Sequence, residues 1–343
     1  MIDDKLKKFI EDIPKAELHI HTDSVPPSVL LGCAKRNDIK LPFSTIQEAH
    51  EWYRFETLDD FLEKWIVTTS VLCTEHDYFD VAYEMGKDMT RQNIVWREAM
   101  FTYQAAHKGR VELDVVLAGF QRGRQAAKDH FGVDLNFIAD IDRTTSGKDS
   151  LEFMKTLLPI AKENNILGIG LDCNEVGFPA GPHKATFDLV HEAGLPVSAH
   201  CGEEYESGPE AVWDIISVMT PTRLDHGVQS IRDEKLLAYL KESQIPLTVC
   251  PYSNVSIQAY EKLSDHPVVA LRNKGVAVTV NSDDPPFFQY DLVDNFIGMV
   301  EAFDLSYGDI EGFVRKGFQS SYAPADVKEK HLTDLDAWLA NNS

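Results

Sequence analysis

Two histidines stand two residues apart in the stretch AELHIHTD, at residues 16–23. In a strand, residues i and i+2 project to the same face, so His19 and His21 would point to one side. Two neutral imidazoles on one face are the beginning of a transition-metal site. The pattern is a weak signal by itself, because two surface histidines at the end of a strand would produce it as well.

Other polar residues of the kinds that bind metals or carry protons follow further apolar stretches. They are His200 and Glu203 in HCGEE, His226 in RLDHG, and Asp283 and Asp284 in NSDDP. Each has an ordinary explanation, such as a buried histidine, a solvated pair of glutamates or a capped helix start. Together they are better explained as one site, because independent surface features need not fall at the ends of successive strands.

Eight apolar, β-rich stretches predict eight strands, at residues 16–21, 93–101, 135–142, 166–172, 196–202, 222–227, 246–251 and 276–284. Helical patterns lie between most of them, and this alternation predicts parallel strands with helical crossovers. Eight such units fit an α/β fold, the (β/α)₈ barrel. An open doubly wound sheet fits less well, since no glycine-rich turn follows the first stretch.

Two regions hold more helix than a simple barrel needs. Residues 45–90 carry extra helical material in the first connection, and residues from about 305 to 340 are expected to form closing helices. No linker or change in composition divides the chain. We therefore expect a single barrel domain over residues 1–343.

In such a barrel, residues at the carboxyl ends of different strands meet at one mouth. We expect a metal there, bound by one of the two aspartates together with His19, His21 and His200. Three imidazoles and a carboxylate suit one Zn²⁺ per chain, or another divalent first-row metal. The metal would lower the pKa of a bound water from about 15.7 to roughly 7, which makes hydroxide available. The remaining polar residues would carry protons and position groups.

The overall charge narrows the classes of partner. The 343 residues include 55 acidic and 33 basic ones, for a formal net charge of -22. Nucleic acids and anionic membranes require a basic surface, so a small molecule in a pocket is the expected partner.

Five cysteines without a CxxC pair indicate a reducing compartment, and the sequence shows no signal peptide or membrane-spanning run. These features predict a cytoplasmic protein.

Five motifs, PKAELHIHTD, HCGEE, RLDHG, VCPYSNV and VNSDDP, together resemble the adenosine deaminase family. The resemblance spans residues 14 to about 290 in the family's order and spacing. It implies a hydrolase acting on C–N bonds in cyclic amidines, which deaminates 6-aminopurines without an organic cofactor. It also implies a zinc site formed by His19, His21, His200 and Asp283.

The resemblance implies a role for each of the other polar site residues. Glu203 would protonate the purine nitrogen N1 beside the reacting carbon. His226 would orient the attacking hydroxide, and Asp284 would contact the substrate, hold the same water and accept its proton. The signature of the zinc deaminases that act on cytosine, H-x-E followed by P-C-x-x-C, does not occur in the sequence.

Two features resemble different subgroups of the family. Asp23 stands where adenosine-acting members have an aspartate that holds the ribose 5′-hydroxyl, whereas adenine deaminases have glutamate; Ser24 follows where glycine is usual. GLDCNE, at residues 170–175, and MFTYQAAHKGRV resemble the adenine deaminases, and Cys173 replaces a glycine whose N–H meets the purine N3. Asp23 favours adenosine or 2′-deoxyadenosine, converted to inosine or 2′-deoxyinosine and ammonia. The alternatives are adenine, converted to hypoxanthine, and a modified adenine or adenosine.

The segment TLDDFLEKW is expected to cover the pocket, with Phe61, Leu62 and Trp65 on one helical face, although packing of this helix on the barrel would explain the spacing equally well.

Two other functions compete with deamination. Amide or ester hydrolysis would use the same barrel and metal without needing Glu203 opposite a ring nitrogen. Purine binding without catalysis would be indicated by a missing ligand, and none is missing.

Overall fold

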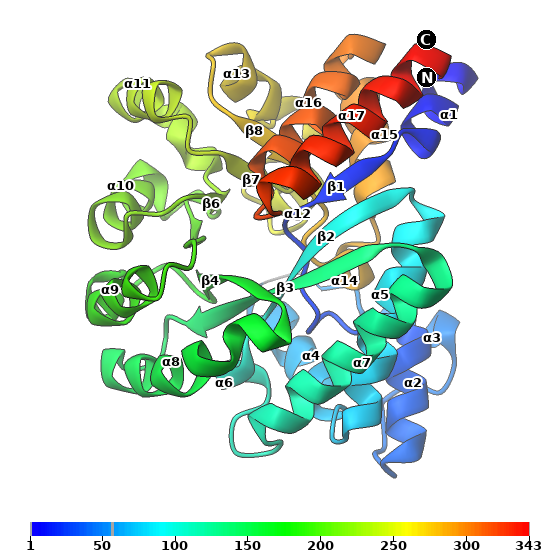
Figure 1. Cartoon of the computed structure of the whole chain (residues 1–343), viewed down its shortest axis with the longest axis vertical. Helices are drawn as coiled ribbons and strands as arrows, with labels where there is room; N and C mark the ends of the chain where they lie inside the picture. Colours follow the sequence, from blue (N-terminus) through cyan, green and yellow to red (C-terminus); the bar gives the residue numbers. More distant parts are fainter. Residues whose placement is uncertain (1, 56–57, 343) are drawn as a thin grey trace.

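The structure is a computed structural model that describes residues 2–55 and 58–342, without the side chains of Leu58, Asp59 and Leu62. In this part of the chain, helices surround a centre of eight strands (Figure 1). The strands are β1 (Lys15–Glu17), β2 (Ile94–Phe101), β3 (Asp134–Asp142), β4 (Ile166–Asp172), β5 (His200–Cys201), β6 (Leu224–His226), β7 (Leu247–Val249) and β8 (Val278–Val280). Each overlaps one of the eight predicted stretches.

The strands form two parallel four-stranded sheets, in the orders β1-β2-β3-β4 and β5-β6-β7-β8. Isolated bridges join the two sheets at both edges. Ile169 of β4 pairs with Val197, just before β5, and Ile20, just after β1, pairs with Asp283, just after β8. The ring of parallel strands is thereby closed, which confirms the predicted (β/α)₈ barrel.

The first strand is shorter than predicted. β1 ends at Glu17, and only single bridges at Ile20 and His21 continue its pairing. Between them, the main-chain N–H of Leu18 donates to the side-chain oxygen of Asn281 at 2.8 Å. A side chain distant in sequence therefore interrupts the ladder, and a local sequence pattern could not show this.

The helices of the described residues are α1 (Asp4–Asp12), α2 (Pro27–Arg36), α3 (Ile46–Trp52), α4 (Leu58–Ser70), α5 (Glu75–Arg91), α6 (Tyr103–Ala106), α7 (Leu113–Phe131), α8 (Gly147–Ala161), η1 (Lys162–Asn164), η2 (Gly181–His183), α9 (Lys184–Glu192), α10 (Gly208–Met219), η3 (Val228–Arg232), α11 (Glu234–Ser243), α12 (Pro251–Ser256), η4 (Leu263–Asp265), α13 (Val268–Asn273), α14 (Pro285–Phe288), α15 (Leu292–Phe303), α16 (Tyr307–Ser320) and α17 (Ala325–Asn342). Helices α2 to α4 lengthen the first connection, and α16 and α17 are the expected closing helices. None of the described helices is long and apolar enough to cross a membrane.

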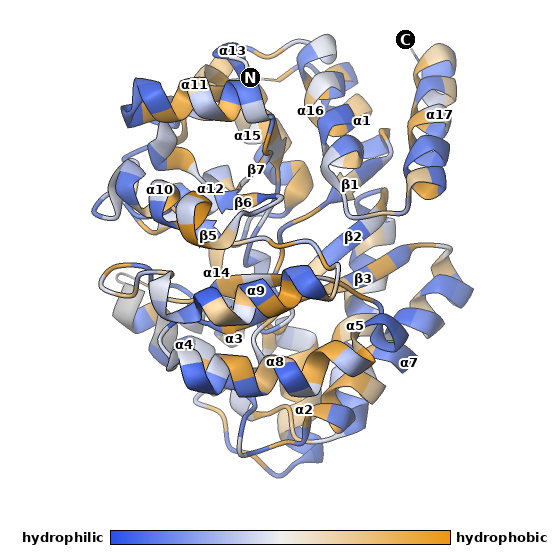
Figure 2. Ribbon diagram, turned by 60° about the vertical axis from the view of Figure 1, so that its left-hand side comes forward, coloured by the Kyte–Doolittle hydropathy of each residue, from blue (hydrophilic) through white to orange (hydrophobic). Residues whose placement is uncertain are grey.

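Burial explains why these stretches form strands and helices. Every residue of β6, β7 and β8 is buried, as expected for parallel strands covered by helices. The outer helices are amphipathic, and α8 and α9 carry apolar and polar residues side by side (Figure 2). The apolar ones, such as Met154 and Leu157 of α8, are buried. This rigid core holds the strand ends, and therefore the site, in place.

Lys15 fastens α1 to the barrel. Its ammonium donates to three main-chain carbonyls near the end of this helix, those of Ile10, Glu11 and Ile13, at 2.7, 3.2 and 2.7 Å. Helix carbonyls lack partners there and favour a positive charge. We expect Lys15→Met to lower the free energy of unfolding by about 1–3 kcal/mol in urea titrations. Lys8→Met, in the exposed part of α1, is the control, and equal effects of the two changes would contradict this role.

Candidate active site

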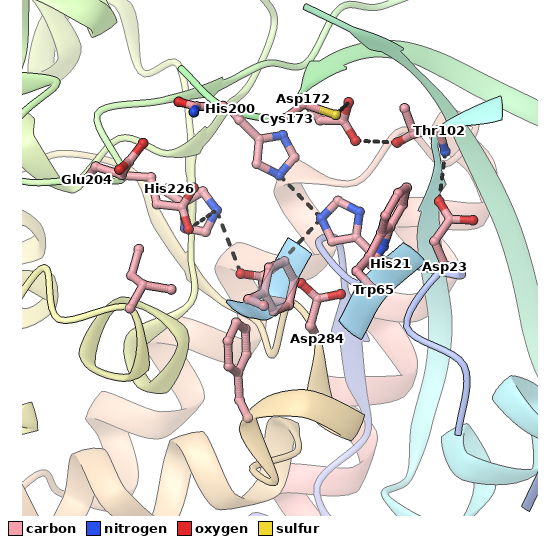
Figure 3. Close-up of a pocket in the computed structure, with 16 residues that line it drawn as sticks. His21, Asp23, Trp65, Thr102, Asp172, Cys173, His200, Glu204, His226 and Asp284 are labelled. Atoms are coloured by element: carbon pink, nitrogen blue, oxygen red, sulfur yellow. Dashed lines mark hydrogen bonds and ion pairs between the residues drawn. The ribbon is translucent and has the colours of Figure 1, made fainter. Parts of the chain in front are cut away.

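A cavity opens at the carboxyl ends of the strands (Figure 3). Its volume, measured as the space that the centre of a water molecule can occupy, is about 140 Å³. This is enough for several waters or a small molecule. Ten residues predicted from the sequence line it: His21, Asp23, Phe61, Trp65, Cys173, His200, Glu203, His226, Asp283 and Asp284. Of the two others, His19 is buried against Asp283, and the side chain of Leu62 lies outside the described residues.

Four potential metal ligands converge at the bottom of the cavity. They are His19, His21, His200 and Asp283, and one donor atom from each lies within 4.8 Å of the others. Nε2 of His19 and Nε2 of His21 each lie 3.3 Å from Oδ1 of Asp283. Nε2 of His21 also lies 3.3 Å from Nε2 of His200. A tetrahedral zinc with ligands at roughly 2.0–2.1 Å would separate its ligands by about 3.3 Å, so this spacing fits such an ion.

The hydrogen bonds of His19 leave a lone pair directed at this group. The Thr248 hydroxyl donates to Asp225 at 2.6 Å, so it accepts from Nδ1–H of His19 at 3.1 Å. The proton on Nδ1 leaves Nε2 unprotonated, and Nε2 is buried with no hydrogen-bond partner among the described residues. An imidazole whose second nitrogen is fixed by a hydrogen bond is the usual form of a metal ligand. The donor set therefore fits a divalent metal.

Three of the site residues have left-handed backbone conformations. The φ angles are 67° at Cys173, 59° at His226 and 67° at Asp283. Non-glycine residues rarely adopt this region, and such strain clusters at functional sites. Cys173 occupies the position where the resemblance expects glycine, and it keeps a backbone conformation that glycine adopts freely.

A carboxylate that the sequence did not single out, Glu175, fixes the loop that carries Glu203. Its Oε2 accepts from the main-chain N–H of Gly202 at 2.8 Å. Its Oε1 accepts from the N–H groups of Glu203 and Glu204 at 2.9 and 3.0 Å. Glu175 belongs to the GLDCNE stretch, but nothing in the sequence shows that it reaches HCGEE. These three bonds fix the main chain from which the Glu203 side chain extends.

The environment of Glu203 favours its protonated form. Burial raises the pKa of this carboxyl well above its ordinary value, and the negative charges of Asp283 and Glu175 add to the effect. Its Oε1 lies 3.6 Å from Nε2 of His226. A carboxylic acid beside a buried cavity is a suitable proton donor.

The two neighbouring aspartates are held by serines. The Ser253 hydroxyl donates to Oδ2 of Asp283 at 2.6 Å, and the Ser24 hydroxyl donates to Oδ1 of Asp284. Burial and the charge of Asp283 raise the pKa of Asp284 to about 7. Ser24 stands where the family usually has glycine, and its hydroxyl takes part in orienting Asp284. Asp284 is thus placed to exchange a proton near neutral pH.

Asp23 lies in the wall of the cavity with both carboxylate oxygens engaged. Oδ2 accepts from the main-chain N–H of Thr102 at 2.9 Å, and Oδ1 is hydrogen-bonded to Nε2 of His107 at 3.1 Å. The Thr102 hydroxyl donates to Asp172, which extends the network along the wall (Figure 3). His107, in the MFTYQAAHKGRV stretch, is buried and lies beside Asp23. The network holds Asp23 against the wall.

Aromatic side chains form another part of the cavity lining. Phe61 and Trp65 of α4 line the cavity, together with Phe288 of α14. The ring of Phe61 also packs on Phe287, with centroids 4.9 Å apart, and stacks on Phe288 at 6.1 Å. This face of α4 therefore both covers the pocket and packs on the barrel, which combines the two interpretations of the sequence pattern.

Known proteins match nearly the whole chain. A family model described as adenosine deaminase matches residues 14–338. Adenine deaminase of Hahella chejuensis is 33% identical over 338 residues, which cover 98% of this chain and 100% of that protein. Adenine deaminase of Wolinella succinogenes is 35% identical over 324 residues, covering 94% and 97%. The crystal structure of adenine deaminase from Arthrobacter aurescens aligns with a TM-score of 0.90 and 33% identity, over 96% of this chain and 99% of that one.

Proposed function

Because the chain belongs to the adenosine deaminase family and is a hydrolytic deaminase acting on C–N bonds, we propose that it converts free adenine to hypoxanthine and ammonia. The similar proteins at 33% and 35% identity over nearly the whole chain are adenine deaminases. This favours the alternative that GLDCNE suggested over the nucleoside that Asp23 suggested.

The structural observation that carries this proposal is the environment of Asp23. A ribose 5′-hydroxyl would need a carboxylate directed into the cavity. Here Thr102 and His107 each bind one of its oxygens, and the Asp23 side chain is only 2% exposed. An unsubstituted base does not require this contact.

The proposed metal is one zinc ion per chain, held by His19, His21, His200 and Asp283. The convergence of four donors and the unpartnered, buried Nε2 of His19 support this assignment. A metal bound there would lower the pKa of a water ligand to about 7, so that hydroxide is available at neutral pH.

The protein's own side chains would manage the protons. Addition of hydroxide to C6 of adenine pushes electrons onto N1, and the protonated Glu203 donates a proton there. His226 orients the attacking water. Asp284, whose pKa lies near 7, accepts the proton of that water and returns it to the 6-amino group. The C–N bond then breaks and ammonia leaves. As the C6 hydroxyl becomes the carbonyl of hypoxanthine, its remaining proton restores the one that Glu203 gave to N1, which completes the hydrolysis without an external acid or base.

The flat, apolar rings of Phe61, Trp65 and Phe288 line the cavity beside these groups. Such rings pack well against a purine and exclude water from the reacting atoms. We propose them as substrate contacts, together with the main-chain N–H of Cys173 at the edge of the base.

Parallel assays of zinc-loaded protein on adenine and adenosine test the substrate. We expect kcat/KM for adenine to exceed that for adenosine by at least about 10²-fold, because both Asp23 oxygens already accept or share a hydrogen bond and the side chain is nearly buried. Ammonia release and the ultraviolet change on loss of the 6-amino group would measure both rates. Preference for adenosine would restore Asp23 as a ribose anchor. Turnover of neither compound would refute adenine and direct the search to modified purines.

A further inference from the structure

A chain of hydrogen bonds leads from the first residue of α13 to His226 in the pocket. The main-chain N–H of Val268 donates to Nδ1 of His266 at 3.2 Å. Nε2 of His266 lies 3.1 Å from Oδ1 of Asn254. Nδ2 of Asn254 lies 3.3 Å from Nδ1 of His226. These four residues connect a helix start outside the pocket to the ring that faces Glu203.

The direction of every bond follows from the first one, because a main-chain N–H can only donate. Nδ1 of His266 is therefore an acceptor, and the proton of the neutral ring is on Nε2. That N–H must meet the oxygen of the Asn254 amide, which turns the NH₂ group toward His226. Nδ1 of His226 is then an acceptor as well, and its ring carries the proton on Nε2.

Burial protects this arrangement from water. His266 is 2% exposed, and Asn254 and His226 are fully buried. Burial also lowers the pKa of His266 to about 3, which keeps this ring neutral. The other neutral tautomer of His226, with its proton on Nδ1, would place an N–H against the NH₂ group of Asn254. The orientation of Asn254 therefore disfavours that tautomer.

We propose that His266 is a positioning residue that acts through Asn254 to keep the proton of His226 on Nε2. That nitrogen lies 3.6 Å from Oε1 of Glu203 and 3.8 Å from Oδ2 of Asp283. It has no hydrogen-bond partner among the described residues, so its N–H is free to donate to an oxygen in the cavity. The opposite tautomer would present a lone pair and could not donate. The inference rests on the proposed function only in taking this oxygen to be that of the attacking water.

Asn254→Asp tests the relay with an almost isosteric change. Both oxygens of aspartate accept, so His226 can bond to it only with a proton on Nδ1. In zinc-loaded protein we expect ¹⁵N NMR to show that Nδ1 of His226 has gained a proton, with the signals assigned by comparison with His226→Gln. We also expect kcat to fall by about 10²–10³-fold while KM changes little, because a correctly protonated group is lost from the transition state.

Substitutions of His266 test the remote end. His266→Leu removes the donor, so the Asn254 amide can turn and both tautomers of His226 should appear. His266→Gln supplies an NH₂ group in a similar place and should restore the wild-type spectrum and most of kcat. The control is His183→Leu, because His183 is also buried with both ring nitrogens hydrogen-bonded, to Ser150 and to the carbonyl of Arg143. It should lower stability without moving the His226 signals.

The proposal is overturned if Asn254→Asp leaves Nδ1 of His226 unprotonated, or if His266→Leu keeps the wild-type spectrum and kcat. A His266→Gln variant that behaves like His266→Leu would also count against it. If Asn254→Asp does not fold, the two His266 variants decide the matter alone. The spectra need no substrate, so a wild type that does not deaminate adenine would refute the proposed function and leave the tautomer result standing.

Discussion

Glu203→Gln is expected to lower kcat for adenine by about 10²–10⁴-fold, the range for loss of a positioned general acid, while zinc remains bound. Glutamine has nearly the same shape, and its amide can donate a hydrogen bond to N1 but cannot transfer the proton. KM should therefore change much less than kcat. The hydrogen bonds that the main-chain N–H groups of residues 202–204 donate to Glu175 do not involve the replaced carboxyl, so the loop should stay in place.

The neighbouring carboxylate provides a matched control for this experiment. Glu204 follows Glu203 in the same loop and its main-chain N–H bonds to the same oxygen of Glu175, yet the sequence pattern assigns it no proton transfer. Glu204→Gln should reduce kcat far less than Glu203→Gln. Steady-state rates, zinc content and thermal midpoints would be measured on both variants. A Glu203→Gln protein that keeps kcat within tenfold of wild type would show that N1 receives its proton from another group.

Much of the site could be predicted because the barrel converts sequence order into spatial proximity. His19 and Asp283 are far apart in the chain, yet both follow strands, and parallel strands in a closed ring place their carboxyl ends together. The spacing of His19 and His21 placed both imidazoles on one side, although a regular strand does not continue through them. The four side chains converge despite that error, because the bridges at Ile20 and His21 preserve the direction of the chain.

The supporting residues could not be predicted, because their partners are set by packing between loops. Glu175 belongs to a recognisable stretch, but its role depends on reaching the main chain of a different strand end. His266 lies in no motif, and its effect on His226 passes through Asn254. Asp23 shows the same limit for substrate choice. Its type suggests a ribose contact, whereas its hydrogen bonds to Thr102 and His107 became visible only in three dimensions.

Asp283→Asn should weaken zinc binding by more than about 10²-fold, since loss of partners that only support metal ligands already costs 10–100-fold. Oδ1 of Asp283 is the atom that both His19 and His21 approach at 3.3 Å. Asparagine tolerates the left-handed backbone at this position, where φ is 67°, so the change removes charge with little added strain. Activity at limiting zinc should fall at least as far as affinity, and a large excess of zinc should recover part of it.

Asp284→Asn separates metal binding from proton transfer. Asp284 is not among the four converging donors, so this variant should keep its zinc and lose kcat through the missing proton acceptor. Zinc content after dialysis, competition with a chelator and activity against added zinc would distinguish the two variants. Because a ligand that binds only the folded state stabilises it, a chelator should lower the thermal midpoint of the wild type and of Asp284→Asn but hardly that of Asp283→Asn. Equal zinc content in all three proteins would mean that Asp283 is not a zinc ligand. The carboxylate that binds the metal would then have to be another residue.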